Sequence, residues 1–404
     1  MTTTDAVVER TVPAWRGGFG RLWTAAVVSR FGDSLRTAAM PLLAASVTDD
    51  PVLIASVTAC GFLPWLLFGL LGGAVADRVD QRRAMWAVDL VRGGLMAAFA
   101  VAVALGHAGI ALLLVLAFAL TTLQTLFDNA ATALLPALVP AESLAGANAR
   151  LMTGQQLAGG LLAAPLVPAL LLAGAAVPYA ADAATYVLAA LLIASLRTGA
   201  PERPPRPAGS TLRKEMAEGL AVLRGDRHLR WLCTATTLCN VGMGALIATL
   251  VVHVTEGLHA GNAGYAATIT AYAVGGVAGG FLARRIAERT GRVRAVFLAG
   301  TVQTGCLVLM GAVPVLAASI AAMAAIGFMG TVWNVQQTTL MQERAPDGML
   351  GRIAAAFRTL AVAGAPLGAL LGGGAAAGWG PHTPALLAAA LFALAVASLT
   401  PLIN

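Results

Sequence analysis

The chain has 404 residues, of which 58% are hydrophobic and only 11% charged, and its mean hydropathy is +0.79. Soluble globular proteins carry about 25% charged residues. So few charges cannot cover a water-facing surface, and we expect most of the chain to lie in lipid. The net charge of +7 would suit a nucleic acid, but the basic residues are scattered over loop ends and form no reading surface, which argues against that partner.

The N-terminal segment, residues 1–21, is polar and mixed in charge. We expect it to be retained as a cytoplasmic tail, because it lacks the short apolar core and the small-residue cleavage site of a signal peptide. The four cysteines lie in apolar runs without metal-binding spacing, so neither a disulfide framework nor a metal site is expected. They are Cys60, Cys233, Cys239 and Cys306.

Twelve apolar runs are long enough to cross a bilayer, which takes about 20 helical residues. They lie near 22–46, 52–75, 85–106, 109–133, 147–173, 177–196, 231–254, 263–283, 295–313, 315–338, 354–377 and 383–402. The predicted fold class is therefore an all-α integral membrane protein. Its two six-helix bundles occupy 22–196 and 231–404, joined by a linker at 197–230. This linker begins proline-rich, and from Ser210 its pattern predicts an amphipathic helix on the membrane face.

Arginine is confined to alternate connections between the predicted spans. With the N-terminus inside, every Lys and Arg of the loops falls on the cytoplasmic side, and six outer connections such as TDDP, GHAG and AVPV have none. The positive-inside rule then places both termini in the cytoplasm.

The two halves of the chain also echo each other. GGAVADR at 72–78 is matched by GGFLARR at 279–285, PAESL at 140–144 by PDGML at 346–350, and APL at 164–166 by APL at 365–367. Three matches in one order and at similar offsets predict a duplicated six-helix unit, which is typical of secondary transporters.

On these residues the chain resembles the major facilitator superfamily over its whole length. The family's loop signature after the second helix corresponds to Gly73, Asp77, Arg78, Arg82 and Arg83. The segments SRFGDSL, DLVRG, LVPAESLAGANA and APDGMLGRI resemble the branch of exporters related to the enterobactin exporter.

The resemblance implies a role for this loop as an inner gate. The family's loop aspartate, here Asp77, faces the N-terminus of the eleventh helix and holds the cytoplasmic side closed, which a helix dipole would favour. A solvated turn is the alternative. Asp80 stands where the family has glycine, which calls the turn geometry into question because a left-handed backbone suits aspartate less well. Asp89 and Arg92, an i, i+3 pair near the same depth, are assigned to this gate.

Charged residues within a span are costly and therefore candidates for function. Arg30, Asp33 and Arg36 fall within one arc of the first helix. Asp33 is the predicted group for proton coupling or for a substrate cation, and a structural ion pair with Arg30 or Arg36 is the alternative.

The predicted substrate cavity takes its polar groups from both halves. The fourth helix provides Gln124, Asp128 and Asn129, without the arginine that the family often places there, so the proton route stays open. The second half provides amide and aromatic groups, for which ordinary hydrogen bonding between helices is the alternative. These are Asn240, Trp333, Asn334, Gln336 and Gln337. In the fifth helix, Gly160, Ala164 and Pro165 partly match the family's antiporter motif.

The predicted function is proton-coupled efflux of an amphiphilic small molecule, such as a drug, siderophore or other secondary metabolite, by a monomer in the cell membrane. We expect no cofactor, no metal and no enzyme activity, since no catalytic constellation emerges and no P-loop is present. The alternatives are a facilitator or importer of the same superfamily, and a receptor or scaffold that has kept the fold.

Overall fold

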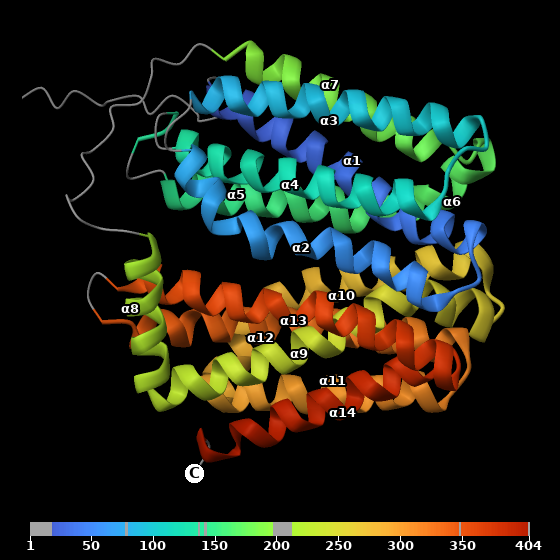
Figure 1. Cartoon of the computed structure of the whole chain (residues 1–404). Helices are drawn as coiled ribbons and strands as arrows, with labels where there is room; N and C mark the ends of the chain where they lie inside the picture. The colour runs from blue at the N-terminus through green and yellow to red at the C-terminus, as the bar shows by residue number, and fades with distance from the viewer. Residues whose placement is uncertain are drawn as a thin grey trace, which may run out of the picture.

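The computed structural model describes residues 18–76, 80–135, 138–140, 144–196, 212–346 and 349–402, and every regular element in these ranges is helical. The helices form two bundles that lie one beside the other (Figure 1). The first contains α1 (Gly18–Val47), α2 (Pro51–Ala76), α3 (Gln81–Ala104), α4 (Ile110–Leu134), α5 (Leu144–Gln156), η4 (Leu157–Ala163), α6 (Ala164–Ala173) and α7 (Val177–Ala194).

The second bundle follows a short helix, α8 (Leu212–Gly225), that crosses its end (Figure 1). It contains α9 (Arg227–Val252), η5 (His253–Gly257), α10 (Gly261–Thr290), α11 (Arg292–Ala312), α12 (Leu316–Arg344), α13 (Leu350–Trp379), α14 (Thr383–Leu399) and η6 (Thr400–Leu402). The bundles meet where α2 packs against α13 and where η4 and α6 pack against α10.

Eleven helical segments in the described ranges are long and apolar enough to cross a membrane. The first helix, α1, is not among them although it has 30 residues. Its sequence includes four charged residues, Arg21, Arg30, Asp33 and Arg36, which lower its apolar character. The reason for these charges is in the packing of α1 against α7 and α3, described below.

The fifth predicted span, 147–173, is not one regular helix. Its middle turns, Leu157–Ala163, are a π-helix between α5 and α6. Pro165 has no N–H to donate to the carbonyl four residues earlier, which loosens the α-helical ladder at this point. Gly159 and Gly160 bring the wide turn close to its neighbours: a Cβ at Gly159 would lie 2.5 Å from Ser34 Oγ of α1. π-turns of this kind are frequent at functional sites.

The backbone of Asp80 is not left-handed, although the family's loop signature has a glycine at this position. Its φ of −67° and ψ of 110° are extended, and its carboxylate accepts a hydrogen bond from the Arg83 N–H at 3.0 Å. Aspartate is a preferred N-cap, so Asp80 begins α3 where a glycine would only permit a turn. The concern about this position was therefore wrong.

The amphipathic helix predicted in the linker is present as α8, and it packs on the second bundle. Glu218 pairs with Arg352 at the start of α13 at 2.7 Å. At the next residue, Gly219, an added Cβ would lie 2.3 Å from the Arg352 carbonyl oxygen. The helix is thus held to α13 by an ion pair and by a close backbone approach.

Close approaches of small residues hold the second bundle together. Where α13 crosses α9, a Cβ at Gly368 would lie 1.9 Å from the Val241 carbonyl oxygen. Where α10 crosses α12, a Cβ at Gly279 would lie 2.2 Å from the Phe328 carbonyl oxygen. In lipid, helices associate through such packing rather than through a hydrophobic drive. Gly279 belongs to the GGFLARR repeat, so a glycine of the second copy serves helix packing.

We predict that Gly368→Ala destabilises the protein by about 1–3 kcal/mol, because α9 and α13 must move apart to admit the methyl group. The control is Gly374→Ala on the same helix, where an added Cβ meets nothing within 4 Å. That substitution should be neutral or slightly stabilising, since alanine favours helix. Thermal unfolding in detergent compares the two variants, and equal melting temperatures would contradict the packing role.

Candidate functional site

A buried ion pair joins α1 to α3 within the first bundle. Arg92 Nη2 lies 2.6 Å from Asp33 Oδ1, and the side chains are 0% and 7% exposed. Two further groups approach the same carboxylate oxygen: the Tyr186 hydroxyl donates to it at 2.5 Å, and Arg36 Nη2 lies at 3.3 Å. Asp33 is therefore held by α3, by α7 and by its own helix.

Arg92 is the centre of this cluster. Its Nη1 lies 3.0 Å from Asp89 Oδ1 one turn earlier, and its Nη2 also donates to Gln124 Oε1 of α4 and to the Tyr186 hydroxyl. Its guanidinium carbon lies 4.0 Å from the centroid of the Tyr186 ring, within cation–π range. A fully buried arginine needs this many partners to offset the loss of its hydration.

The second arginine of the cluster, Arg36, lies between Asp33 and Asp182. Its Nε is 3.4 Å from Asp182 Oδ2 on α7, and the Asp182 side chain is 0% exposed. We define the buried charge cluster as Asp33, Asp89 and Asp182 with Arg36 and Arg92. It holds three carboxyl groups and two guanidinium groups, so its net charge is −1 when every group is ionised.

Arg30 faces a different partner from the other two charges of its helix. Its Nη2 lies 3.9 Å from Asp128 Oδ2 of α4, and the two side chains are 36% and 27% exposed. Gln124 Nε2 donates to Asp128 Oδ1 at 2.9 Å, while Gln124 Oε1 accepts from Arg92. One amide thus connects the accessible Arg30–Asp128 pair with the buried cluster. The neighbouring Asn129 amide donates to the Thr125 carbonyl of its own helix at 2.7 Å.

Only part of the predicted inner gate lies within the described residues. Gly73 lies in α2, and Asp77 and Arg78 lie outside the described residues, so the gate role of the loop stays a prediction. Arg82 donates to the Ala194 carbonyl at the end of α7, and Arg83 pairs with Asp80 at 3.7 Å.

Asp89 and Arg92, which the sequence assigned to the same gate, contact each other. Arg92 also contacts Asp33, Gln124 and Tyr186. The i, i+3 spacing gave their pairing correctly. It could not show which helices face them, and the structure groups the pair with Asp33.

A cavity of about 730 Å³ lies between the two bundles. This volume is in the range of small-molecule sites. The first bundle lines it with polar groups, including Arg30, Asp33 and Gln155, and the second with mostly apolar and aromatic groups, including Tyr265 and Tyr272. The wall is therefore amphipathic, with one polar and one apolar side.

A second cavity of about 200 Å³ opens among the helices of the second bundle. Asn240, Trp333 and Asn334 line it, and their predicted role as a substrate wall stays a prediction. The Trp333 indole N–H donates to Gln337 Oε1 at 2.9 Å, which confirms that these i, i+4 residues share a face. Gln336 points elsewhere: it is 1% exposed, its amide donates to the Ala283 carbonyl of α10, and it lines neither cavity.

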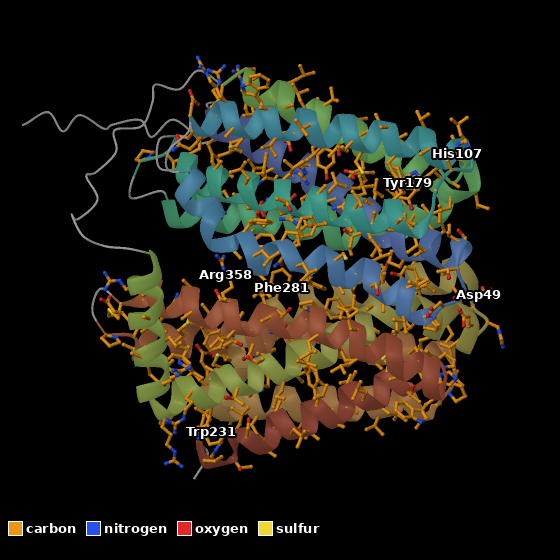
Figure 2. All side chains as sticks on the ribbon, in the orientation of Figure 1. Asp49, His107, Tyr179, Trp231, Phe281 and Arg358 are labelled. Carbon is orange, nitrogen blue, oxygen red and sulfur yellow. The ribbon has the colours of Figure 1, made fainter. Side chains whose placement is uncertain are left out.

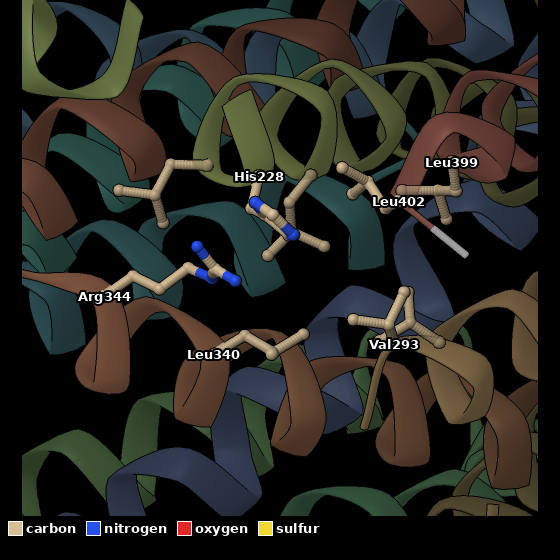
Figure 3. Close-up of a pocket in the computed structure, with 9 residues that line it drawn as sticks. His228, Val293, Leu340, Arg344, Leu399 and Leu402 are labelled. Carbon is tan, nitrogen blue, oxygen red and sulfur yellow. The ribbon is translucent and has the colours of Figure 1, made fainter. Parts of the chain in front are cut away.

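A third pocket is too small to be a site. It lies between α9, α11, α12 and α14, where His228, Leu340 and Arg344 surround a volume of about 10 Å³ (Figure 3). That space holds at most one water molecule.

Sequence reasoning missed two residues of these sites. Tyr186 completes the buried cluster, and the one available signal is its i, i+4 spacing from Asp182. Tyr272 lines both larger cavities. Outside these sites, Arg358 is an exposed cation of the apolar helix α13, toward the α8 end of the molecule in Figure 2, and the rule that charges within a span are functional candidates would have marked it.

The sequence profile of the Major Facilitator Superfamily matches residues 22–368. An uncharacterized MFS-type transporter of Sinorhizobium fredii is 28% identical over 379 residues, which is 88% of each chain. Macrolide efflux protein A of Streptococcus pyogenes is 24% identical over 229 residues, 55% of each chain. A Mycobacterium tuberculosis transporter of the same type is 34% identical over 145 residues, so the match spans about a third of that relative.

Solved structures share the fold at low identity. A point mutant of the nucleoside transporter NupG superposes with a TM-score of 0.82 at 9% identity, covering 96% of this chain and 100% of that one. The transporter FucP in its outward conformation gives 0.62 at 16% identity, covering 96% and 99%. At these identities the likeness concerns the fold alone.

We predict that Arg92→Met destabilises the protein by about 3–5 kcal/mol, because Asp33 and Asp89 then lose their shared buried cation. The control is Arg83→Met, whose side chain is 81% exposed in its pair with Asp80 and should cost at most about 1 kcal/mol. Adding Asp89→Leu to Arg92→Met should restore part of the loss by removing an unpaired charge. Thermal unfolding in detergent checks this, and similar melting temperatures for both single variants would count against the cluster as a structural centre.

Proposed function

Since the chain belongs to the major facilitator superfamily, we propose that it is a proton-coupled exporter of an amphiphilic small molecule that works by alternating access. The observation that carries the proposal is the buried charge cluster, whose carboxyl groups outnumber its guanidinium groups by one. A net charge buried in a membrane protein is costly. One bound proton makes the cluster neutral, and releasing that proton charges it.

Two of the three carboxyl groups of the cluster have an unpaired oxygen that could hold the proton. Asp33 Oδ2 and Asp89 Oδ2 are buried and have no hydrogen-bond partner among the described residues, whereas Asp182 Oδ2 lies 3.4 Å from Arg36 Nε. Asp33 is the proposed exchange site, because among the three it is the one that also lines the central cavity. The Gln124 amide gives a second connection, from Arg92 to the accessible Asp128.

The membrane arrangement is proposed on the same basis. The eleven apolar helices with α1 make twelve spans, and the two bundles, 22–196 and 231–404, rock against each other around the central cavity. The arginines of the loops lie at the end of the molecule where α8 packs, and the positive-inside rule places this end in the cytoplasm. Both termini are then cytoplasmic. The protein is proposed to be a monomer in the plasma membrane of a bacterium. We assign the end of the molecule where α2 packs tightly against α13 to the outer side of the membrane. At this contact a Cβ added at Gly373 would lie 2.8 Å from Ala55 Cβ.

Export is favoured over import by the similarity to macrolide efflux protein A and by the amphipathic wall of the central cavity. A facilitator would have no use for an exchangeable buried proton. A receptor or scaffold would need neither the cavity nor the surplus carboxyl group.

We predict that Asp33→Asn abolishes transport driven by a pH gradient but keeps exchange across a membrane without a gradient. An amide cannot take up and release the proton, while the cavity keeps its shape. In proteoliposomes loaded with radiolabelled erythromycin, loss of the label measures substrate movement with and without a gradient, and a dye follows internal pH. Glu343→Gln is the control, since its carboxylate forms a 49% exposed surface pair with Arg292. Gradient-driven transport by Asp33→Asn at the parent rate would contradict the assignment.

A further inference from the structure

The cavity of about 200 Å³ in the second bundle has a mixed polar and apolar lining without a charged group. We call it the side cavity. Its polar groups are three amides, one threonine hydroxyl, one tyrosine hydroxyl and one indole N–H: Asn240, Asn334, Gln303, Thr236, Tyr272 and Trp333. It shares Ile247, Tyr272 and Asn334 with the central cavity, so the two spaces adjoin.

Part of this wall is already satisfied by hydrogen bonds within the protein. The Trp333 indole and the Thr236 hydroxyl both donate to Gln337 Oε1, at 2.9 and 2.8 Å. The Gln303 amide donates to the Ala299 carbonyl of its own helix at 3.1 Å. These bonds fix the side chains in place around the cavity.

The remaining polar groups of the wall have free capacity. The Asn240 and Asn334 amides and the Tyr272 hydroxyl have no hydrogen-bond partner among the described residues, and Gln303 uses only its nitrogen. A polar group within a membrane span costs free energy unless it is paired. Several such groups that face one cavity are therefore suited to a ligand with matching donors and acceptors.

The charged groups lie on the other side. Two arginines and a tyrosine approach Oδ1 of Asp33, and its side chain is 7% exposed, so its charge is already balanced and little of it faces a substrate cation. Arg30 is 36% exposed but has Asp128 beside it. The first bundle thus keeps its charges paired, and the second offers neutral hydrogen-bonding groups.

We infer that the side cavity binds an uncharged hydroxyl- or amide-bearing group of the substrate, such as a sugar, while the apolar body of the substrate lies in the central cavity against Tyr265 and Ile269. This inference deepens the proposed function and rests on it. A volume of 200 Å³ equals that of about seven water molecules in the liquid, which is room for one such group. Phe62 of α2 also lines the side cavity, so closure there involves both bundles.

Three probes with one coumarin body test the chemistry of the group: 4-methylumbelliferyl glucoside, 4-methylumbelliferyl phosphate and a trimethylammonium coumarin. Binding to the full-length protein in nanodiscs is measured by titration. We expect the glucoside to bind most tightly. Asn240→Leu should weaken its binding about 10-fold, because two hydrogen bonds of ordinary strength are lost. Asn334→Leu, at a more exposed position, repeats the test should Asn240→Leu fail to fold.

The control is Gln342→Leu, which removes an exposed amide of α12 that lines neither cavity. It should leave glucoside binding unchanged. The inference is overturned if the parent prefers a charged probe, if it does not bind the glucoside, or if both asparagine variants bind the glucoside as the parent does. Transport is scored separately: glucoside binding that depends on Asn240, with no movement under a pH gradient, would overturn the proposed function and leave the side cavity as a binding site.

Discussion

The ion pair between Arg92 and Asp33 is the interaction on which the first bundle depends. It connects α1 to α3, and through Tyr186 and Asp182 both are tied to α7. A buried ion pair seldom adds stability over an apolar core, but a group left without its partner costs several kcal/mol. The arrangement therefore acts as a constraint: the three helices must keep one relative position for every charge to stay paired.

That constraint also explains why α1 can be so polar. Isolated in lipid, a helix with four charges would be unfavourable, and its hydropathy alone does not mark it as a span. In the bundle, Asp33 and Arg36 face α3 and α7. Gly32 lets α1 approach α7 so closely that an added Cβ would lie 2.0 Å from Thr185 Oγ1. The glycine and the charges belong to the same contact.

Local signals in the amino-acid sequence were sufficient for the all-helical membrane fold and for several of the charged residues that the structure brings together. Apolar length agrees with the eleven helices of the described residues that could cross a membrane, but not with α1. The rule that charges in a span have a purpose selected Asp33, Arg36, Asp89 and Arg92. Neither of these signals shows which helices face one another. Asp89 and Arg92 were accordingly grouped with the loop rather than with Asp33, and Gln336 was assigned to a cavity that its side chain does not reach. The π-turn at Leu157–Ala163 and the capping role of Asp80 depend on backbone geometry that periodicity does not encode.

The two halves of the chain echo each other in sequence but differ in chemistry. The first bundle holds the buried carboxyl and guanidinium groups of the core, and the second has amides, an indole, the buried His253 and closely packed glycines. In a protein that couples proton binding to substrate binding, it is an advantage that the two binding sites lie in different bundles. A proton bound at Asp33 and a neutral group bound near Asn240 do not compete for the same atoms. They can then influence each other through the relative position of the bundles, since a conformational equilibrium that both sites bias couples them.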